Sequence, residues 1–596
     1  MADMIERPEL ADRRVGLLRL AVGLAQGLTL YGLHRAGELK VWPATDAPLF
    51  AASSLAVAFA PLVVLAGLGH LRRSTLAVWF VAAAAVCAIF AGYRAMTAAT
   101  GTDDGFPNFP SGLAAAAFLF IAHHLIVPAD ADRTWVAPYR AYFDRAWLDS
   151  VQLGLAIAFT GAFWLVLGLG AALFALIGIK QFGTFIGHDW FYFPATAVMF
   201  ATGVHLADIR VGLTRGLRTV ALILLSWLLP LMSVIAVAFV VALPFTGLAA
   251  LWRSGASTGV LLSAMAVLIL LINAAYQDGD HPAPGVQKWA ARATALALAG
   301  LAGVAAYGIA LRIGEHGLTP QRILAGACAL VAGGYAAGYA YAAVRPGRWM
   351  RRLEATNIAA APLILVIVFA LFTPLADPAR LSVDDQVARL ERGRTKVADF
   401  DFRFLRFDAG GYGLTALRRL AVQTTGPRAA AIRMAAGEAL KRDNRYAAEP
   451  VTGAARLATY PQGVVVPPEL IAQLENGDRQ ACLTEACDAY VLDLDGDGLS
   501  DVVIKGPYQM SVYARIDPNG LWIKRGTLTG LSCGDTLAAL RAGKAVPTAP
   551  QWKGRDLVAG GERLVFDPWV QSTACPTKTE PHPNTSSPGP PPSAVR

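Results

Sequence analysis

Charged residues are scarce in this 596-residue chain, and their scarcity argues against an ordinary soluble protein. Asp, Glu, Lys and Arg make up 16% of the residues, and hydrophobic residues make up 55%. Soluble domains carry roughly 25% charged residues. The net charge of +9 falls mainly in short segments between apolar runs. Because no basic stripe with interleaved aromatic residues is present, we expect no nucleic-acid partner.

Signatures of known enzyme classes are also missing. The sequence contains no Walker loop, no HExxH and no dinucleotide fingerprint after a predicted strand. A lipid-linked glycosyltransferase would place an acidic residue in the first outer loop, where Glu38 and Asp46 lie. That loop is short, which is more typical of solvated surface charge. We therefore assign no catalytic residue and leave enzymatic activity open.

Long apolar segments, by contrast, are abundant. A transmembrane helix needs about 20 mainly apolar residues. Eleven such segments lie near residues 15–33, 47–70, 74–96, 111–128, 148–178, 189–209, 218–246, 257–277, 287–312, 322–344 and 357–375. No later segment approaches this length. The sequence predicts an all-α polytopic membrane bundle of about eleven transmembrane helices, followed by a small α+β extramembrane domain.

The same pattern predicts four parts of the chain. Residues 1–14 form a cytoplasmic tail, 15–375 the helical bundle, 376–575 the extramembrane domain and 576–596 a disordered tail rich in Pro and Ser. With the N-terminus inside, inner segments hold 17 Lys and Arg, and outer loops hold seven. Four of the 17, Arg345, Arg348, Arg351 and Arg352, precede the last apolar segment. Since an excess of Lys and Arg in short loops marks the cytoplasmic side, the C-terminal domain is predicted to lie outside.

The six cysteines divide between the two parts. Cys87 and Cys328 fall in apolar segments, where cysteine behaves as a small hydrophobic residue. The other four lie in the extramembrane part: Cys482, Cys487, Cys533 and Cys575. An even set in one domain favours disulfides and an oxidising compartment, with 482–487 and 533–575 as the hypothesised pairs. A zinc site is the alternative, but no CxxC pair is present and His582 is the one histidine nearby.

An acidic loop in the extramembrane part predicts a calcium site. Its carboxylates occupy loop positions 1, 3, 5 and 9: Asp493, Asp495, Asp497 and Asp501. Gly498 permits a sharp turn, and the Leu499 carbonyl would supply position 7. Position 12 is Ile504, and the flanking segments look like strands, so a calcium-binding hairpin is expected rather than a helix–loop–helix hand. The alternative is an Asp- and Gly-rich turn without an ion. We expect structural Ca²⁺.

Polar residues near the inner ends of predicted spans are a second candidate site. They are His123, His124, His205, Asp208, Asn273, Gln277 and Asp278. Arg19 and Gln26 lie within the first span. Ionisable groups inside a membrane are costly and often functional. Two interpretations remain open: solvated residues at the membrane interface, or a polar vestibule for protons or a polar substrate.

Two longer segments and the start of the first span resemble a known family. The segments are LPFTGLAALWRSGASTGVLLSAMAVLILLINAAYQDG (243–279) and DPARLSVDDQVARLERGRTKVADFDFRFLRFDAGGYG (377–413), and the opening is RLAVGLAQGLTLYGL. They resemble bacterial membrane proteins of the "domain of unknown function 4153" family. The resemblance implies a polytopic inner-membrane protein of proteobacterial type, with a C-terminal extramembrane domain. It carries over no catalytic residue.

Three classes of function therefore remain. The first is a non-enzymatic envelope protein whose calcium-stabilised periplasmic domain engages a periplasmic or membrane protein partner. The second is a transporter or lipid-handling protein that uses the bundle, and the third is a lipid-linked glycosyltransferase. The one sharp motif is extramembrane, which favours the first class. A cavity lined by polar groups inside the bundle would favour the second.

Overall fold

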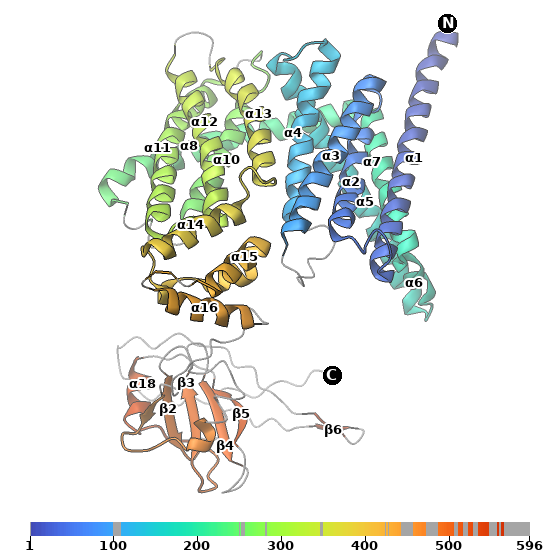
Figure 1. The fold of residues 1–596 in the computed structure, drawn as a ribbon. Coiled ribbons are helices and arrows are strands. Elements are labelled where there is room, and N and C mark those ends of the chain that lie inside the picture. The colour runs from blue at the N-terminus through green and yellow to red at the C-terminus, as the bar shows by residue number, and fades with distance from the viewer. Residues whose placement is uncertain are drawn as a thin grey trace, which may run out of the picture. The chain divides into compact units, whose positions relative to one another are not determined.

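The chain forms two compact units, Met1–Arg442 and Asp443–Arg596, each described here by itself (Figure 1). The structure is a computed structural model. It describes residues 2–98, 109–248, 251, 257–280, 283–345, 350–423, 425–426, 428–442, 457–471, 487–505, 510–515, 522–528, 534–547, 557–559 and 562–564.

Long apolar helices make up most of the first unit. They are α1 (Ala2–Leu39), α2 (Ala47–Gly67), α3 (Arg73–Thr97), α4 (Phe109–Asp132), α5 (Tyr139–Leu176), α8 (Val211–Thr246), α10 (Ser257–Tyr276), α11 (Gly285–His316), α12 (Pro320–Val344) and α13 (Leu353–Leu371). In the described part of the chain, these ten helices contain stretches long and apolar enough to cross a membrane. The predicted fold class is confirmed: a polytopic helical bundle precedes a small domain that contains a sheet.

The remaining predicted span corresponds to α7 (Asp189–Ile209), which follows the short α6 (Gln181–Gly187). It is not among the ten, because polar residues such as His205 and Asp208 lower its hydropathy. However, α7 lies antiparallel along α1. A Cβ at Gly27 would overlap Pro194, and one at Gly16 would overlap the His205 ring. Since α1 and α7 touch over this length, α7 crosses whatever layer α1 crosses.

The helices pack as two groups that share α13. One core joins α2, α3 and α4 around Phe90 and Leu119. The other joins α5, α8, α10, α11 and α12 around Met265, Leu298 and Tyr339. From α13, Phe369 and other apolar residues pack on the first core, while residues nearer its start pack on the second. The last long helix therefore holds the two groups together.

Three shorter helices follow α13 and pack on one end of this unit: α14 (Pro378–Arg392), α15 (Gly410–Ala421) and α16 (Ala429–Lys441). The Tyr93 hydroxyl at the end of α3 donates to Asp377 Oδ2 at 2.8 Å and lies 2.8 Å from the Tyr412 hydroxyl on α15. Asp385 on α14 accepts from the backbone N–H of Leu318 at 2.7 Å. The transmembrane bundle was predicted to end at residue 375. The first compact unit includes more of the chain, up to Arg442, because these three helices pack on the bundle.

The second unit contains a five-stranded sheet with strand order β1-β2-β3-β4-β5. Its strands are β1 (Leu457–Tyr460), β2 (Cys487–Leu492), β3 (Asp501–Lys505), β4 (Met510–Arg515) and β5 (Trp522–Leu528). The β1–β2 pair is parallel and the other pairs are antiparallel. Val502, Ile504, Tyr513 and Trp522 form its core with Leu470. Helix α18 (Gly534–Arg541) and the pair β6 (Leu557–Ala559) and β7 (Glu562–Leu564) complete the described part, so the predicted tail 576–596 lies outside it.

Candidate functional site

A cavity of about 260 Å³ lies between α2, α4, α5 and α7. Its walls are mainly apolar: Phe59, Leu62, Val63, Ala66, Ala116, Leu119, Phe120, Leu153, Phe200 and Val204. Four polar residues complete the lining: His123, His124, Asp149 and Gln152. Binding sites for small molecules typically combine apolar walls with a few placed polar groups, and this cavity has that composition.

His124 and Asp149 form a nearly buried pair at the polar end of the cavity. The His124 Nε2 atom lies 3.2 Å from Asp149 Oδ2, and Arg145 Nε donates to the same oxygen at 2.7 Å. The other ring nitrogen, His124 Nδ1, lies 2.5 Å from the Phe120 carbonyl oxygen. Because a carbonyl accepts only, Nδ1 carries a proton. Nε2 therefore faces the Asp149 carboxylate beside the cavity.

His123 carries a buried hydrogen-bond donor beside the cavity. The Trp79 indole Nε1–H donates to His123 Nδ1 at 3.2 Å, which places the proton of the neutral imidazole on Nε2. His123 is 5% exposed. Among the described residues, its Nε2 atom has no hydrogen-bond partner. A buried donor left unpaired costs about 1–3 kcal/mol, and a ligand with an acceptor group would remove that cost.

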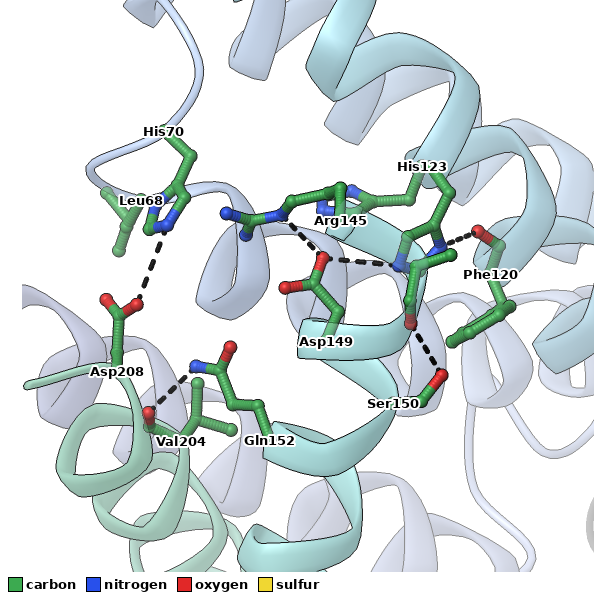
Figure 2. A network of polar contacts seen from close by, with 12 residues as sticks. Leu68, His70, Phe120, His123, Arg145, Asp149, Ser150, Gln152, Val204 and Asp208 are labelled. Carbon is green, nitrogen blue, oxygen red and sulfur yellow. Dashed lines mark hydrogen bonds and ion pairs between the residues drawn. The ribbon is translucent and has the colours of Figure 1, made fainter. Parts of the chain in front are cut away.

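A second polar cluster surrounds Arg19, which is 1% exposed. Arg19 Nη2 lies 2.8 Å from Asp208 Oδ2, and Nε donates to the Leu65 carbonyl at 3.0 Å. His70 Nε2 lies 3.5 Å from Asp208 Oδ1 (Figure 2). Burial, and then the nearby positive charge of Arg145, lower the pKa of His70, while Asp208 opposes them. This cluster links α1, α7 and the end of α2.

A third polar cluster lies between α5, α10, α12 and α13. Asn357 Nδ2 donates to Asn273 Oδ1 at 2.6 Å, and Asn273 Nδ2 donates to the Tyr339 hydroxyl at 2.7 Å. The Tyr339 hydroxyl donates to Asn357 Oδ1 at 2.6 Å, and the Tyr139 hydroxyl donates to Asn273 Oδ1 at 3.3 Å. The polar groups of this cluster satisfy one another's hydrogen bonds, so the cluster cross-links the four helices.

The structure separates the polar residues singled out from the sequence. His123 and His124 line the cavity. Asp208 contacts Arg19, and the His205 ring lies beside it, whereas Asn273 belongs to the third cluster. Gln277 and Asp278 follow α10, where Asp278 lies 4.0 Å from Arg140. Arg19 and Gln26 are buried within the bundle.

Sequence reasoning missed Asp149 and Gln152, which complete the cavity. Arg145 and Asp149 are four residues apart on α5, a spacing that places oppositely charged side chains on one helical face. That pair at the start of a long apolar segment was the available signal. Gln152 donates to the Val204 carbonyl at 2.9 Å and so ties α5 to α7. Glu38 and Asp46, the two acidic residues considered for a glycosyltransferase site, have local partners. Asp46 caps α2, and Glu38 pairs with Arg35.

The acidic loop connects β2 and β3 in the second unit. Three of its four aspartates come together: Asp493, Asp495 and Asp501 each offer an oxygen, and these oxygens lie within 4.8 Å of one another. Asp497 is outside this group and accepts from the Leu499 N–H at 2.7 Å. Burial, followed by the neighbouring carboxylates, raises the pKa of Asp501, although a hydrogen bond from the Leu494 N–H opposes this shift.

The described residues include only one of the four extramembrane cysteines. Cys487 begins β2 and is 1% exposed. Cys482, Cys533 and Cys575 lie outside the described residues, so the disulfide pairing stays a prediction. Of the two cysteines in the bundle, Cys87 is buried on α3 and Cys328 is exposed on α12.

The cavity and most of the bundle fall within a recognised sequence family. Residues 51–420 match the family described as "Domain of unknown function (DUF4153)". The chain belongs to this family. No curated protein matches the chain, and no solved structure does. Since this family's description assigns no activity, a functional conclusion about this member rests on its own geometry.

Proposed function

We propose that this protein is a lipid-handling membrane protein that holds an apolar chain in the cavity between α2, α4, α5 and α7. The main observation that supports this proposal is that the cavity combines apolar walls with polar groups from α4 and α5. An apolar chain would contact residues such as Leu62 and Leu119, and its polar end would meet His123 and His124. This proposal takes up the second class of function inferred from the sequence.

The unpartnered donor on His123 supports a ligand that carries a hydrogen-bond acceptor. An ester, ether or phosphate oxygen placed at Nε2 would pair the one orphaned nitrogen of this ring. The His124 ring and the Asp149 carboxylate supply further polar groups at the same end. A lipid whose polar group joins its apolar chain matches this arrangement, whereas a fully polar solute would leave the apolar walls unmatched.

Filling the cavity tests this proposal. We expect the full-length protein, purified in mild detergent, to retain lipid detectable by native mass spectrometry. Ala116→Phe places a ring in the cavity and should remove that lipid, because Ala116 is part of the lining. Leu113→Phe is the matched control, since Leu113 lies on the same helix, is 61% exposed and does not line the cavity.

The result that would overturn the proposal is equal lipid retention in both variants. Replacing His123 by Phe separates the roles of the ligand's two ends. It keeps a ring but removes the donor, so lipids with an acceptor near the chain should be lost and plain hydrocarbons should be retained. No change in the retained species would contradict the assigned acceptor.

We further propose that the bundle lies in a bacterial inner membrane, with the N-terminus in the cytoplasm and the second unit in the periplasm. The excess of Lys and Arg in the inner segments supports this orientation. Alkaline phosphatase fused after Leu375 should be active, and the same reporter fused after Arg352 should be inactive. Equal activity at the two positions would contradict the orientation.

A second candidate function concerns the extramembrane unit, which we propose is stabilised by Ca²⁺ and engages a periplasmic or membrane protein partner. The donor set fits the ion, because calcium prefers carboxylate and carbonyl oxygens. Asp493, Asp495 and Asp501 would hold it, and Gly496 and Gly498, at φ values of 78° and 82°, allow the loop to turn around it. Bound there, the ion would neutralise clustered carboxylates and fix the β2–β3 hairpin.

Hydrogen exchange on the full-length protein tests the calcium site. Added Ca²⁺ should slow exchange across β2 and β3, and a chelator should reverse this effect. Asp495→Asn should abolish the response. Glu469→Gln, an exposed acid elsewhere in the same unit, should preserve it. Hydrogen exchange that does not change on addition of Ca²⁺ would contradict the proposed calcium site.

A further inference from the structure

A hollow lined by arginines lies where α12 ends and α13 begins. It measures about 510 Å³, and its charged lining consists of Arg345, Arg351, Arg352 and Glu354. A second hollow of about 460 Å³ runs between the same two helices and shares Arg352 and Ala355 with the first. The two hollows therefore adjoin at Arg352 and Ala355, and together they are called the groove here, with its basic end at the start of α13.

The second hollow is mainly apolar and runs from the arginines along both helices. Its lining includes Val331, Gly334, Ala359 and Leu363. The helices touch at Gly338, where an added Cβ would overlap Thr356. At Gly334, one turn earlier on α12, a Cβ would meet nothing within 4 Å. The helices thus separate at Gly334 and leave an apolar channel beside it.

One tyrosine brings two of the arginines together. The guanidinium carbons of Arg345 and Arg352 lie 5.1 and 5.0 Å from the centre of the Tyr341 ring. Arg352 Nη1 also donates to the Tyr341 hydroxyl. Cation–π contacts hold the guanidinium groups in place but leave their positive charges uncompensated. An anion beside them would relieve the repulsion between these like charges.

Carboxylates do not supply that anion. Within the described part of the chain, none of Arg345, Arg351 and Arg352 forms an ion pair with a carboxylate. The nearby Glu354 instead accepts a hydrogen bond from the Tyr276 hydroxyl at 2.6 Å. Elsewhere at the same end of the helices, arginines do have acidic partners: Arg72 with Asp130, Arg140 with Asp280, Arg145 with Asp149 and Arg218 with Asp144.

We propose that this groove binds an anionic phospholipid, with its phosphate among Arg345, Arg351 and Arg352 and one acyl chain beside Gly334. Guanidinium groups pair with phosphate through charge-assisted hydrogen bonds, and basic pockets between transmembrane helices suit anionic headgroups. The N-terminus of α13 lies at the same place, and the helix dipole adds positive potential there. This site is separate from the cavity between α2, α4, α5 and α7.

Native mass spectrometry of the full-length protein with added lipids tests this site. Phosphatidylglycerol should bind more tightly than phosphatidylcholine. The triple variant R345Q/R351Q/R352Q should bind phosphatidylglycerol on the order of a hundredfold more weakly. The variant R210Q/R215Q/K288Q is the matched control. It removes the same charge at the same end of the helices, from residues that line neither hollow, and should bind like the wild type. Equal loss in both triple variants, or no preference for phosphatidylglycerol, would overturn the proposal.

The acyl chain and the phosphate are tested separately. Gly334→Leu fills the channel and should weaken phosphatidylglycerol binding. Gly333→Leu, the neighbouring residue outside the lining, should leave it unchanged. Inorganic phosphate should not displace the lipid at equal concentration. Displacement by phosphate, together with unchanged lipid binding by Gly334→Leu, would identify a free-phosphate site and contradict the lipid. Because the cavity variant Ala116→Phe leaves this groove intact, the two proposals fail independently.

Discussion

The Nε2 atom of His124 lies 3.2 Å from Oδ2 of Asp149, and this contact joins α4 to α5. Both side chains are nearly buried, with exposures of 10% and 11%. Arg145 approaches the same carboxylate from one turn earlier on α5. The carboxylate therefore serves a positive guanidinium and a proton-bearing ring at once, and removing its charge affects both.

Asp149→Asn should destabilise the protein by about 3–5 kcal/mol, because it leaves Arg145 and His124 without their shared carboxylate in a buried place. Thermal unfolding of the full-length protein in detergent measures the change. Glu38→Gln is the control. It breaks an exposed pair with Arg35, and such pairs contribute less than about 1 kcal/mol. Equal effects would show that the Asp149 cluster is solvated.

The lowered pKa of His70 predicts that the protein loses stability in mild acid. Its pKa in the folded state is lowered below 6.5, chiefly by burial, so between that pKa and 6.5 the unfolded chain binds more protons. The contribution of neutral His70 to the free energy of unfolding is therefore fully present above about pH 6.5. It falls as the pH drops toward the folded-state pKa. From about pH 7.5 to about pH 5.5, the melting temperature of the wild type should fall more than that of His70→Gln.

The comparison for His70 is His316→Gln, which replaces an exposed histidine at the other end of the helices. It should show the same pH dependence as the wild type. Arg145, Asp208, Asp149 and Arg19 are the charges that act on His70. An identical acid response in all three proteins would mean that His70 is not the group responsible.

Asn273 and Asn357 should show coupled contributions to stability. Each replacement by Leu leaves buried partners unpaired and should cost about 1–3 kcal/mol. The double variant should cost less than the sum by roughly 0.5–3 kcal/mol, because the second change removes a group already deprived of its partner. Chemical unfolding of the four proteins gives the coupling. Strict additivity would contradict the cross-link.

Asp377 should stabilise helices α14 and α15 through two contacts. It caps α14 by accepting from the Ala379 N–H at 2.7 Å, and it also accepts from the Tyr93 hydroxyl. Asp377→Ala should speed hydrogen exchange in α14 and in α15, with loss of the cap alone costing about 0.5–2 kcal/mol. Asp46→Ala removes the cap of α2 and should leave α14 and α15 unchanged. Faster exchange confined to the first turn of α14 would count against the Tyr93 link.

The sequence predicted the bundle well because lipid imposes a simple rule. Residues 257–277 and 322–344 were recognisable as spans from apolar composition alone, and α10 and α12 match them closely. Composition also identified α7 as the predicted span 189–209, but it could not show how α7 packs against α1, because that packing depends on glycines meeting Pro194 and His205 from a distant part of the chain. The last predicted span, which ends at residue 375, corresponds to α13. Composition could not show that the amphipathic helix α14 packs on the bundle, because that depends on a partner such as Leu318.

The candidate site was only partly readable for the same reason. His123 and His124 are conspicuous in an apolar segment, and the sequence singled them out. Their meaning depends on Asp149 and Trp79, which come from other helices and were not selected. The basic residues near 345–352 were interpreted as topological markers. The second role proposed for them depends on the separation of α12 and α13 at Gly334, which the sequence does not show.

Arg19 also constrains how the protein is made. Its guanidinium is satisfied by carbonyl groups at the end of α2 and by Asp208 on α7, and the neighbouring His205 is 186 residues further along the chain. At roughly 5–20 residues per second, translation reaches α7 about 10–40 s after α1 has emerged. During that interval a bare guanidinium cannot settle in hydrocarbon. The first helix therefore has to stay beside the insertion machinery or near the headgroups until its distant partner arrives.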